Sequence, residues 1–127
     1  MYQTLTGYLP EIKKNTSGNW TIQSKEPMPY IAYIPLVGDF EEEVYNFGEN
    51  HPEYGLGKYQ DILRANGISG GIESIKNADV SKMNDKAVLA LLVWAARAER
   101  YLTASWLDLF ESGAVKKWLL RLKELDN

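Results

Sequence analysis

Residues 84–102 read NDKAVLALLVWAARAERYL, and the ten positions 87–96 carry no charge. This apolar run is too short to cross a bilayer, which needs about 20 residues, so it predicts a buried helix. Asn84 is a favourable N-cap, because its side-chain oxygen can accept a hydrogen bond from a free N–H group of the first turn. A helix that is apolar on every side needs neighbours on every side. We therefore expect a central helix over residues 85–102, surrounded by the other helices.

Two shorter helices are predicted after the central one. The first spans residues 104–111, with Thr103 as its cap, and Gly113 ends it. The second spans residues 114–125, where Leu120 lies off the apolar stripe and should be exposed. Short connections favour antiparallel packing of these helices. The side chains that they should bury are Trp106, Leu107, Phe110, Val115, Trp118, Leu119, Leu122 and Leu125.

Helical periodicity also precedes the central helix. One helix should begin near Pro35 and stop at Gly48, with its apolar stripe opposite its acidic residues. A second should end at Asn66-Gly67, a pair that favours a left-handed C-terminus. Residues 72–83 are polar and should be irregular. The two apolar stripes consist of Val37, Phe40, Val44, Phe47, Leu56, Tyr59, Ile62 and Leu63.

The N-terminal third gives mixed signals. The spacing of Leu5, Tyr8, Leu9 and Ile12 predicts a short helix that ends near Lys14. Residues 20–34 are rich in β-forming side chains, which favours either a short β-hairpin or extended chain laid over the core.

The fold class that follows is mainly α. We expect residues 1–127 to form one compact, single-domain bundle of five or six helices around the central apolar helix at about 85–102. The segment near 20–34 either adds a short β-hairpin to this bundle or lies over it as extended chain. The length matches one domain of roughly 100–150 residues, and a chain that is 45% hydrophobic and 24% charged is not typical of a disordered protein.

The composition also excludes several chemistries. The chain has no cysteine, which removes thiol nucleophiles and the usual zinc sites. His51 is the single histidine, and its spacing from Glu49 and Glu53 matches no metal signature, so we expect neither a metal nor a cofactor. No nucleophile-elbow or zinc-protease motif occurs, so no catalytic residue is predicted. The first residues lack the pattern of a signal peptide, and we expect a cytoplasmic protein.

A Tyr-rich, acidic segment is the strongest indication of a binding surface. Six acids and no lysine or arginine occur between Asp39 and Glu53. They either form a solvated helix face or meet a basic partner. Tyrosine is enriched at protein interfaces, which supports the second interpretation. The partner-binding candidates are Tyr30, Tyr33, Glu41, Glu42, Glu43, Tyr45 and Tyr54.

A second candidate site lies at the end of the central helix. Arg97, Arg100 and Tyr101 share one helical face by their spacing, whereas Glu99 points elsewhere. The arginines either cap the helix and pair with acids from neighbouring helices, or they form an anion site from two forked donors. The first interpretation assumes that the two guanidinium groups are buried and therefore need partners.

The block Arg97-Ala98-Glu99-Arg100-Tyr101 and the closing run WLLRLKEL at 118–125 resemble a family of small bacterial proteins catalogued as a domain of unknown function. In the family pattern, Gly stands at Ala98, Phe at Tyr101, and Cys-Asp-Gly at 102–104, so this chain lacks the family's Asp-Gly. The resemblance implies a shared fold and a bacterial or phage origin, and it implies no activity. Other matching residues are Met28-Pro29-Tyr30, Tyr59, Ile62, Leu63, Asn66-Gly67, 89–93 and Glu111-Ser112-Gly113.

These patterns lead to one functional expectation and two alternatives. We expect a non-enzymatic interaction module that binds a protein partner, or a second copy of itself, through the Tyr-rich, acidic surface. The first alternative is a phage or mobile-element inhibitor of a host defence nuclease, whose acids imitate nucleic-acid phosphates. The second is a small anion-ligand binder or enzyme that uses Arg97 and Arg100. Because the net charge is -3, direct nucleic-acid binding is not expected, and neither is membrane binding.

Overall fold

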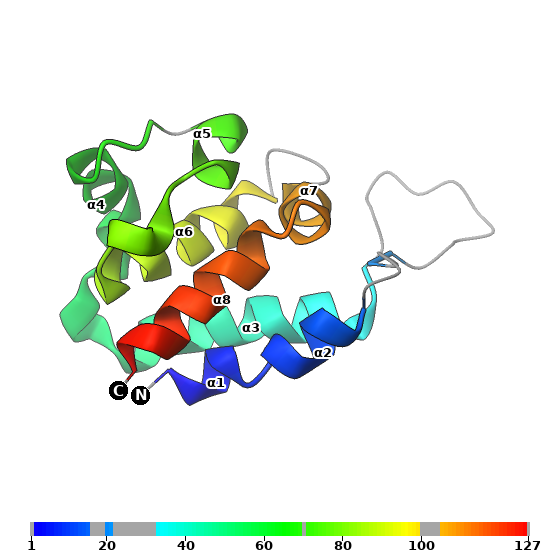
Figure 1. The fold of residues 1–127 in the computed structure, drawn as a ribbon. Helices are drawn as coiled ribbons and strands as arrows, with labels where there is room; N and C mark the ends of the chain where they lie inside the picture. Colours follow the sequence, from blue (N-terminus) through cyan, green and yellow to red (C-terminus); the bar gives the residue numbers. More distant parts are fainter. Residues whose placement is uncertain (1, 16–19, 22–32, 70, 100–104, 127) are drawn as a thin grey trace.

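Helix α6 (Asp85–Ala98) lies at the centre of the fold, as its apolar sequence predicts (Figure 1). Every side chain from residue 87 to residue 96 is buried, and α6 contacts helices on several sides. The Asn84 side chain accepts a hydrogen bond from the backbone N–H of Ala87 at 2.9 Å, which confirms the predicted N-cap. The helix ends at Ala98 rather than near residue 102.

This computed structural model describes residues 2–15, 20–21, 33–69, 71–99 and 105–126. They form eight α-helical segments and three short 3-10 turns, a mainly α bundle as the sequence predicts. None of the helices in these ranges has both the length and the hydropathy that a membrane crossing requires. The remaining elements are α1 (Gln3–Thr6), α2 (Leu9–Lys14), α3 (Pro35–Asn50), η1 (Pro52–Tyr54), η2 (Leu56–Lys58), α4 (Tyr59–Ala65), α5 (Ile72–Lys76), η3 (Val80–Lys82), α7 (Ser105–Glu111) and α8 (Ala114–Leu125).

Helix α8 has the predicted bounds and packs its apolar stripe against α6, α1, α2 and α7. Gly113 adopts φ of 84°, a left-handed conformation that favours glycine, and it separates α7 from α8. Arg121 Nε donates to the backbone oxygen of Met83 at 3.0 Å, which ties α8 to the segment before α6. Leu120, expected to be exposed, is half-buried, and Leu107 and Leu125, expected in the core, are half-buried as well.

Helix α3 corrects the prediction that Gly48 stops it. The helix continues to Asn50, and the backbone N–H of His51 still bonds to the oxygen of Phe47 at 3.0 Å. The actual stop is Pro52, because proline disfavours a helical conformation at the residue before it. A single glycine lowers helix stability by about 1 kcal/mol, which the burial of Phe47 in the core can offset.

The N-terminal helix is broken in two, a second difference from the prediction. Gly7 and Tyr8 separate α1 from α2. Pro10 lacks the N–H that a continuous helix would bond to the oxygen of Thr6, so one unbroken helix would lose that hydrogen bond. The backbone N–H of Tyr2 donates to Asp126 at 3.0 Å, so the two ends of the chain lie side by side (Figure 1).

The segment at 72–83, predicted to be irregular, contains α5 and η3. Ile75 is completely buried, and Lys76 forms ion pairs with Glu73 at 3.2 Å and with Asp108 of α7 at 3.3 Å. The burial of Ile75 and the ion pair with Asp108 are tertiary contacts that hold a helix too short to be stable alone. The predicted end of α4 is confirmed, since Gly67 adopts φ of 76°.

The ends of the region at 20–34 are paired in the way that a hairpin requires. Thr21 and Tyr33 form an antiparallel bridge, and the backbone N–H of Ile34 donates to the oxygen of Trp20 at 3.0 Å. Residues 22–32, where the rest of the predicted hairpin falls, lie outside the described part of the chain.

Candidate functional site

An acidic face covers helices α2 and α3 around the ring of Tyr8. Tyr8 is half-buried and makes an edge contact with the Phe40 ring, with 5.4 Å between centroids. The pKa of Tyr8 is raised above its ordinary value by burial and then by nearby negative charges. Those charges identify the neighbours of the hydroxyl. The acidic face is therefore defined by Tyr8 together with Glu43, Asp39, Glu11 and Glu42.

The exposure of these acids follows from the helical periodicity of α3. Asp39 and Glu42 are three residues apart and fully exposed, and Glu49 continues the same exposed stripe. Glu41 and Glu43 flank the stripe and are half-buried. Glu41, Glu42 and Glu43, which the sequence singled out, thus all lie at the surface of one helix, and one of the three is fully exposed.

The tyrosines of the predicted surface are engaged inside the molecule. The Tyr33 hydroxyl donates to Glu99 Oε1 at 2.8 Å, and the Tyr45 hydroxyl donates to the backbone oxygen of Ala96 at 3.2 Å. The Tyr54 hydroxyl lies 2.8 Å from that of Tyr2. All three rings are half-buried. These hydroxyls are committed to intramolecular hydrogen bonds and are poorly placed to bond a partner. Tyr30 lies outside the described residues.

Tyr8 is the tyrosine that sequence reasoning missed. Its hydroxyl makes no hydrogen bond to any residue that the structure describes, although negative charges on α2 and α3 raise its pKa. The helical spacing of Tyr8 with Leu5 and Ile12 indicated a core position, and that pattern concealed the polar edge of the ring. The one available signal was Glu11, three residues later on the same helical face.

Arg97 is exposed, which corrects the expectation of a buried guanidinium that needs partners. Its guanidinium carbon lies 5.6 Å from the centroid of the Tyr59 ring, at the distance of a cation–π contact. Arg100 and Tyr101, the other two members of the predicted anion site, lie outside the described residues. The anion site therefore remains a prediction, with one member placed at the surface.

Glu99, which was expected to point away from the face of Arg97, makes its contacts with Tyr33 and α7, whereas Arg97 lies over Tyr59. Glu99 Oε1 accepts hydrogen bonds from the Tyr33 hydroxyl at 2.8 Å, the Ser105 hydroxyl at 3.2 Å and the backbone N–H of Trp106 at 2.8 Å. The Tyr33 hydroxyl accepts in turn from the backbone N–H of Leu107 at 3.1 Å. Glu99 and Tyr33 thus satisfy two of the free N–H groups at the start of α7, those of Trp106 and Leu107.

A second buried hydrogen-bond cluster joins the start of the chain to the start of α6. The Tyr2 hydroxyl donates to Asp85 and lies 2.8 Å from the Tyr54 hydroxyl. The Tyr2 ring also packs against Phe47, with 5.7 Å between centroids. The pKa of Tyr2 is raised well above its ordinary value by burial, then by the bonds to Asp85 and Tyr54. The pKa of Tyr33 is likewise raised, by burial and then by the bond to Glu99.

These two tyrosines should make the fold sensitive to alkali. Above about pH 10 the unfolded chain loses the phenol protons that the folded chain keeps, so the free energy of unfolding falls as the pH rises. Below that pH both the folded and the unfolded chain keep these protons, so the stabilisation that the two tyrosines provide is fully present. Each of Tyr2 and Tyr33 should contribute a slope of about 1.4 kcal/mol per pH unit. Urea unfolding between pH 8 and pH 11 measures it.

The Tyr2→Phe/Tyr33→Phe double variant should be less stable than the wild type at pH 8. Its free energy of unfolding should also fall less steeply between pH 8 and pH 11. Tyr59→Phe is the matched control, because the Tyr59 hydroxyl bonds at the surface to Gln60. An equal alkaline slope in the wild type and the double variant would show that other groups cause the decline.

His51 is held against the core by its neighbours. Its ring stacks on Phe47 with 4.3 Å between centroids, and its Nδ1 lies 3.6 Å from Glu53. Within the described ranges, no group of three or more His, Cys, Asp or Glu side chains is placed to hold a metal ion.

Comparison with known proteins gives no relative from which a role could be transferred. The chain matches no protein-family model, no curated protein and no solved structure.

Proposed function

We propose that this protein is a non-enzymatic interaction module whose acidic face binds a basic surface of another protein. The observations that carry the proposal are the exposed carboxylates of Glu11, Asp39 and Glu42 on α2 and α3. The half-buried Tyr8 ring packs against Phe40 of the same helix α3. Charge of one sign accelerates the encounter with an oppositely charged partner and excludes partners of like charge. An aromatic ring at the middle of the face supplies the contact area that typically dominates binding energy.

The charge density of α3 favours a protein partner over the nuclease-inhibitor alternative. Asp39 and Glu49 are ten residues apart, so the exposed stripe is about 15 Å long. It carries three exposed carboxylates, at Asp39, Glu42 and Glu49. Duplex DNA carries one charge for about every 1.7 Å of its axis. A channel built for a duplex would therefore meet along this stripe about a third of the charges that it is shaped to hold.

Self-association is a second form of the same proposal, supported by the charge distribution of α8. Lys116, Lys117 and Lys123 are exposed on that helix. A second copy could therefore offer a basic surface to the acidic face. Sedimentation velocity at low and high salt separates the two forms, because a dimer held by these charges dissociates as salt screens them.

Charge reversal on the acidic face should abolish binding. We expect the Asp39→Lys/Glu42→Lys variant to bind a lysine-rich peptide at least about tenfold more weakly than the wild type, since two attractive charges become repulsive. Titration of 15N-labelled protein measures the affinity, and the wild-type amide shifts should concentrate in α2 and α3.

The matched control reverses two exposed carboxylates elsewhere, in Asp61→Lys/Glu111→Lys. It changes the net charge equally and should bind within about twofold of the wild type. A protein captured from a bacterial lysate by the wild type and the control, but not by the acidic-face variant, identifies the natural partner. Equal binding by all three proteins would exclude the acidic face.

A further inference from the structure

A pocket of about 230 Å³ lies between α3 and α6, with η2 at its edge. Three apolar side chains contribute to its lining: Val44 from α3, Leu56 from η2 and Val93 from α6. Each is at least nine-tenths buried in the core. The Tyr45 ring forms part of the wall, and its hydroxyl bond to the backbone oxygen of α6 fixes the ring in place. The pocket therefore has an apolar surface set by packed core residues.

Two side chains of opposite charge line this pocket. They are Glu49 of α3 and Arg97 of α6. Neither side chain forms an ion pair or a hydrogen bond with any residue that the structure describes, and they do not pair with each other. Arg97 rests over the Tyr59 ring, which orients the guanidinium while its N–H donors stay available. One apolar pocket is thus bordered by a carboxylate and a guanidinium that form no ion pair or hydrogen bond within the described part of the chain.

Two glycines leave space in the lining. A Cβ built on Gly57 would meet no atom within 4 Å, and a Cβ built on Gly48 would meet only the Leu56 side chain, at 4.0 Å. Neither glycine has a positive φ. Larger side chains at these positions would not strain the backbone, and Gly57 lines the pocket, so a bulky side chain at Gly57 is a convenient test of access to it.

We propose that this pocket binds a free α-amino acid with an apolar side chain. Arg97 receives the carboxylate, Glu49 receives the ammonium group, and the side chain lies against Val44, Leu56 and Val93. The size supports a single amino acid, because the volume is below the roughly 300–1,000 Å³ of pockets that bind drug-sized ligands. A ligand with a single charge would pair with either Arg97 or Glu49 and would be repelled by the other residue. Glu49 continues the exposed stripe of α3 but does not belong to the acidic face as defined above, and the Asp39→Lys/Glu42→Lys variant retains both Glu49 and Arg97.

Leucine and three analogues test this assignment. Leucinamide lacks the carboxylate, 4-methylpentanoate lacks the ammonium group, and glycine lacks the apolar side chain. We expect L-leucine to bind at least about tenfold more tightly than each analogue, since each loses one of the three contacts. Amide shifts of 15N-labelled protein give the dissociation constants, and the largest shifts should fall around residues 44–57 and 93–97.

Removing one of the two charges should remove the preference of the pocket for leucine over the analogue that lacks the matching charged group. Glu49→Gln removes the repulsion of a lone carboxylate, so 4-methylpentanoate should then bind as well as leucine does. Arg97→Gln should do the same for leucinamide. Glu42→Gln and Arg64→Gln, which neutralise exposed charges outside the pocket, should leave all affinities unchanged. Gly57→Phe should block leucine binding, while Gly38→Ala, at an exposed position of α3 with open space around it, should not.

The results that would overturn the proposal are specific. No leucine-dependent shifts at concentrations up to about 50 mM would exclude the site, because such concentrations reveal even a millimolar dissociation constant. Equal leucine affinity in the wild type and both charge variants would show that these charges do not hold the ligand. Shifts confined to other residues would place any leucine site elsewhere, and preference for 4-methylpentanoate over leucine in the wild type would indicate a simple anion pocket.

Discussion

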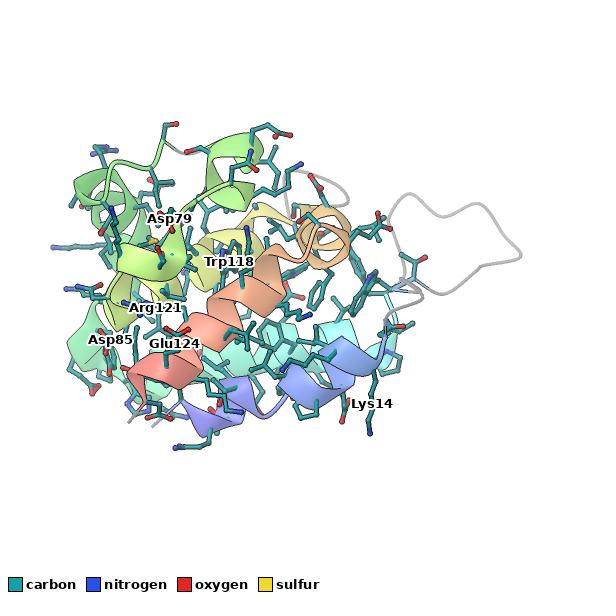
Figure 2. All side chains as sticks on the ribbon, in the orientation of Figure 1. Lys14, Asp79, Asp85, Trp118, Arg121 and Glu124 are labelled. Carbon is teal, nitrogen blue, oxygen red and sulfur yellow. The ribbon has the colours of Figure 1, made fainter. Side chains whose placement is uncertain are left out.

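Replacing Trp118 by alanine should lower the free energy of unfolding by about 3–5 kcal/mol, the range measured when large aromatic side chains are removed from protein cores. Trp118 lies on α8 (Figure 2) and is completely buried. Helix α8 contacts α6, α7 and the two N-terminal helices, so the cavity left behind would border several elements at once. Urea denaturation, monitored by circular dichroism, measures the change in the free energy of unfolding.

A second variant separates the contribution of the side-chain volume of Trp118 to stability from that of its indole N–H. The indole N–H is buried and has no hydrogen-bond partner among the described residues, and such a group costs about 1–3 kcal/mol. Trp118→Phe removes this N–H and keeps an aromatic ring, so it should lose much less stability than Trp118→Ala. Leu120→Ala, on the half-buried side of the same helix, is the control and should cost about 1 kcal/mol or less. A loss below about 1.5 kcal/mol for Trp118→Ala would contradict the central position of α8.

Glu99→Ala should be the most damaging substitution of a charged residue, at about 2–3 kcal/mol. It would leave the Tyr33 hydroxyl, the Ser105 hydroxyl and the backbone N–H of Trp106 without their shared acceptor. Glu99→Gln keeps an acceptor oxygen and loses the charge, so it should cost about half as much. Thermal and urea unfolding measure both variants.

Glu111 provides the comparison, because it is an exposed acid at the end of α7. Glu111→Ala should change the free energy of unfolding by less than about 0.5 kcal/mol. If Glu99→Ala and Glu111→Ala were equally mild, the cluster around Glu99 would contribute nothing to holding α7. Tyr33→Phe should reproduce part of the Glu99→Ala loss, since the Tyr33 hydroxyl links Glu99 to the N–H of Leu107.

The contacts of Glu99 give one residue of the Arg-x-Glu-Arg block a structural role. Sequence spacing drew attention to the two arginines, because guanidinium groups need partners when buried. Arg97 is exposed, and the acid between the arginines makes the defined contacts. The spacing of residues along one helix could not reveal this. Tyr33, which completes the cluster, is 66 residues away from Glu99 in the chain.

The helices themselves were largely predictable, because helix signals are local. The cap at Asn84, the left-handed glycines at 67 and 113 and the bounds of α8 all depend on residues within a few positions of each other. The errors arose where local signals compete. Gly48 signalled a stop that the core overrode, and Ile75 anchors a short helix that its own sequence does not favour.

The candidate surfaces were predictable only in outline. The sequence located the acids on α3, because charge and helical period are both visible in the chain. It did not place Tyr8 among them, since that contact joins the N-terminal segment to α3. It also treated Tyr45 and Arg97 as members of different sites, whereas both line the pocket between α3 and α6.

Periodicity and capping specify which residues are helical and which face each helix buries, because both depend on a repeat of 3.6 residues and on hydrogen bonds to the nearest turn. The partners of the half-buried polar groups were fixed by folding alone. Tyr2 meets Asp85, and Tyr33 meets Glu99, across separations of 83 and 66 residues. Such pairs form because polar groups removed from water must find partners wherever the packed helices bring them, and no local pattern encodes that position.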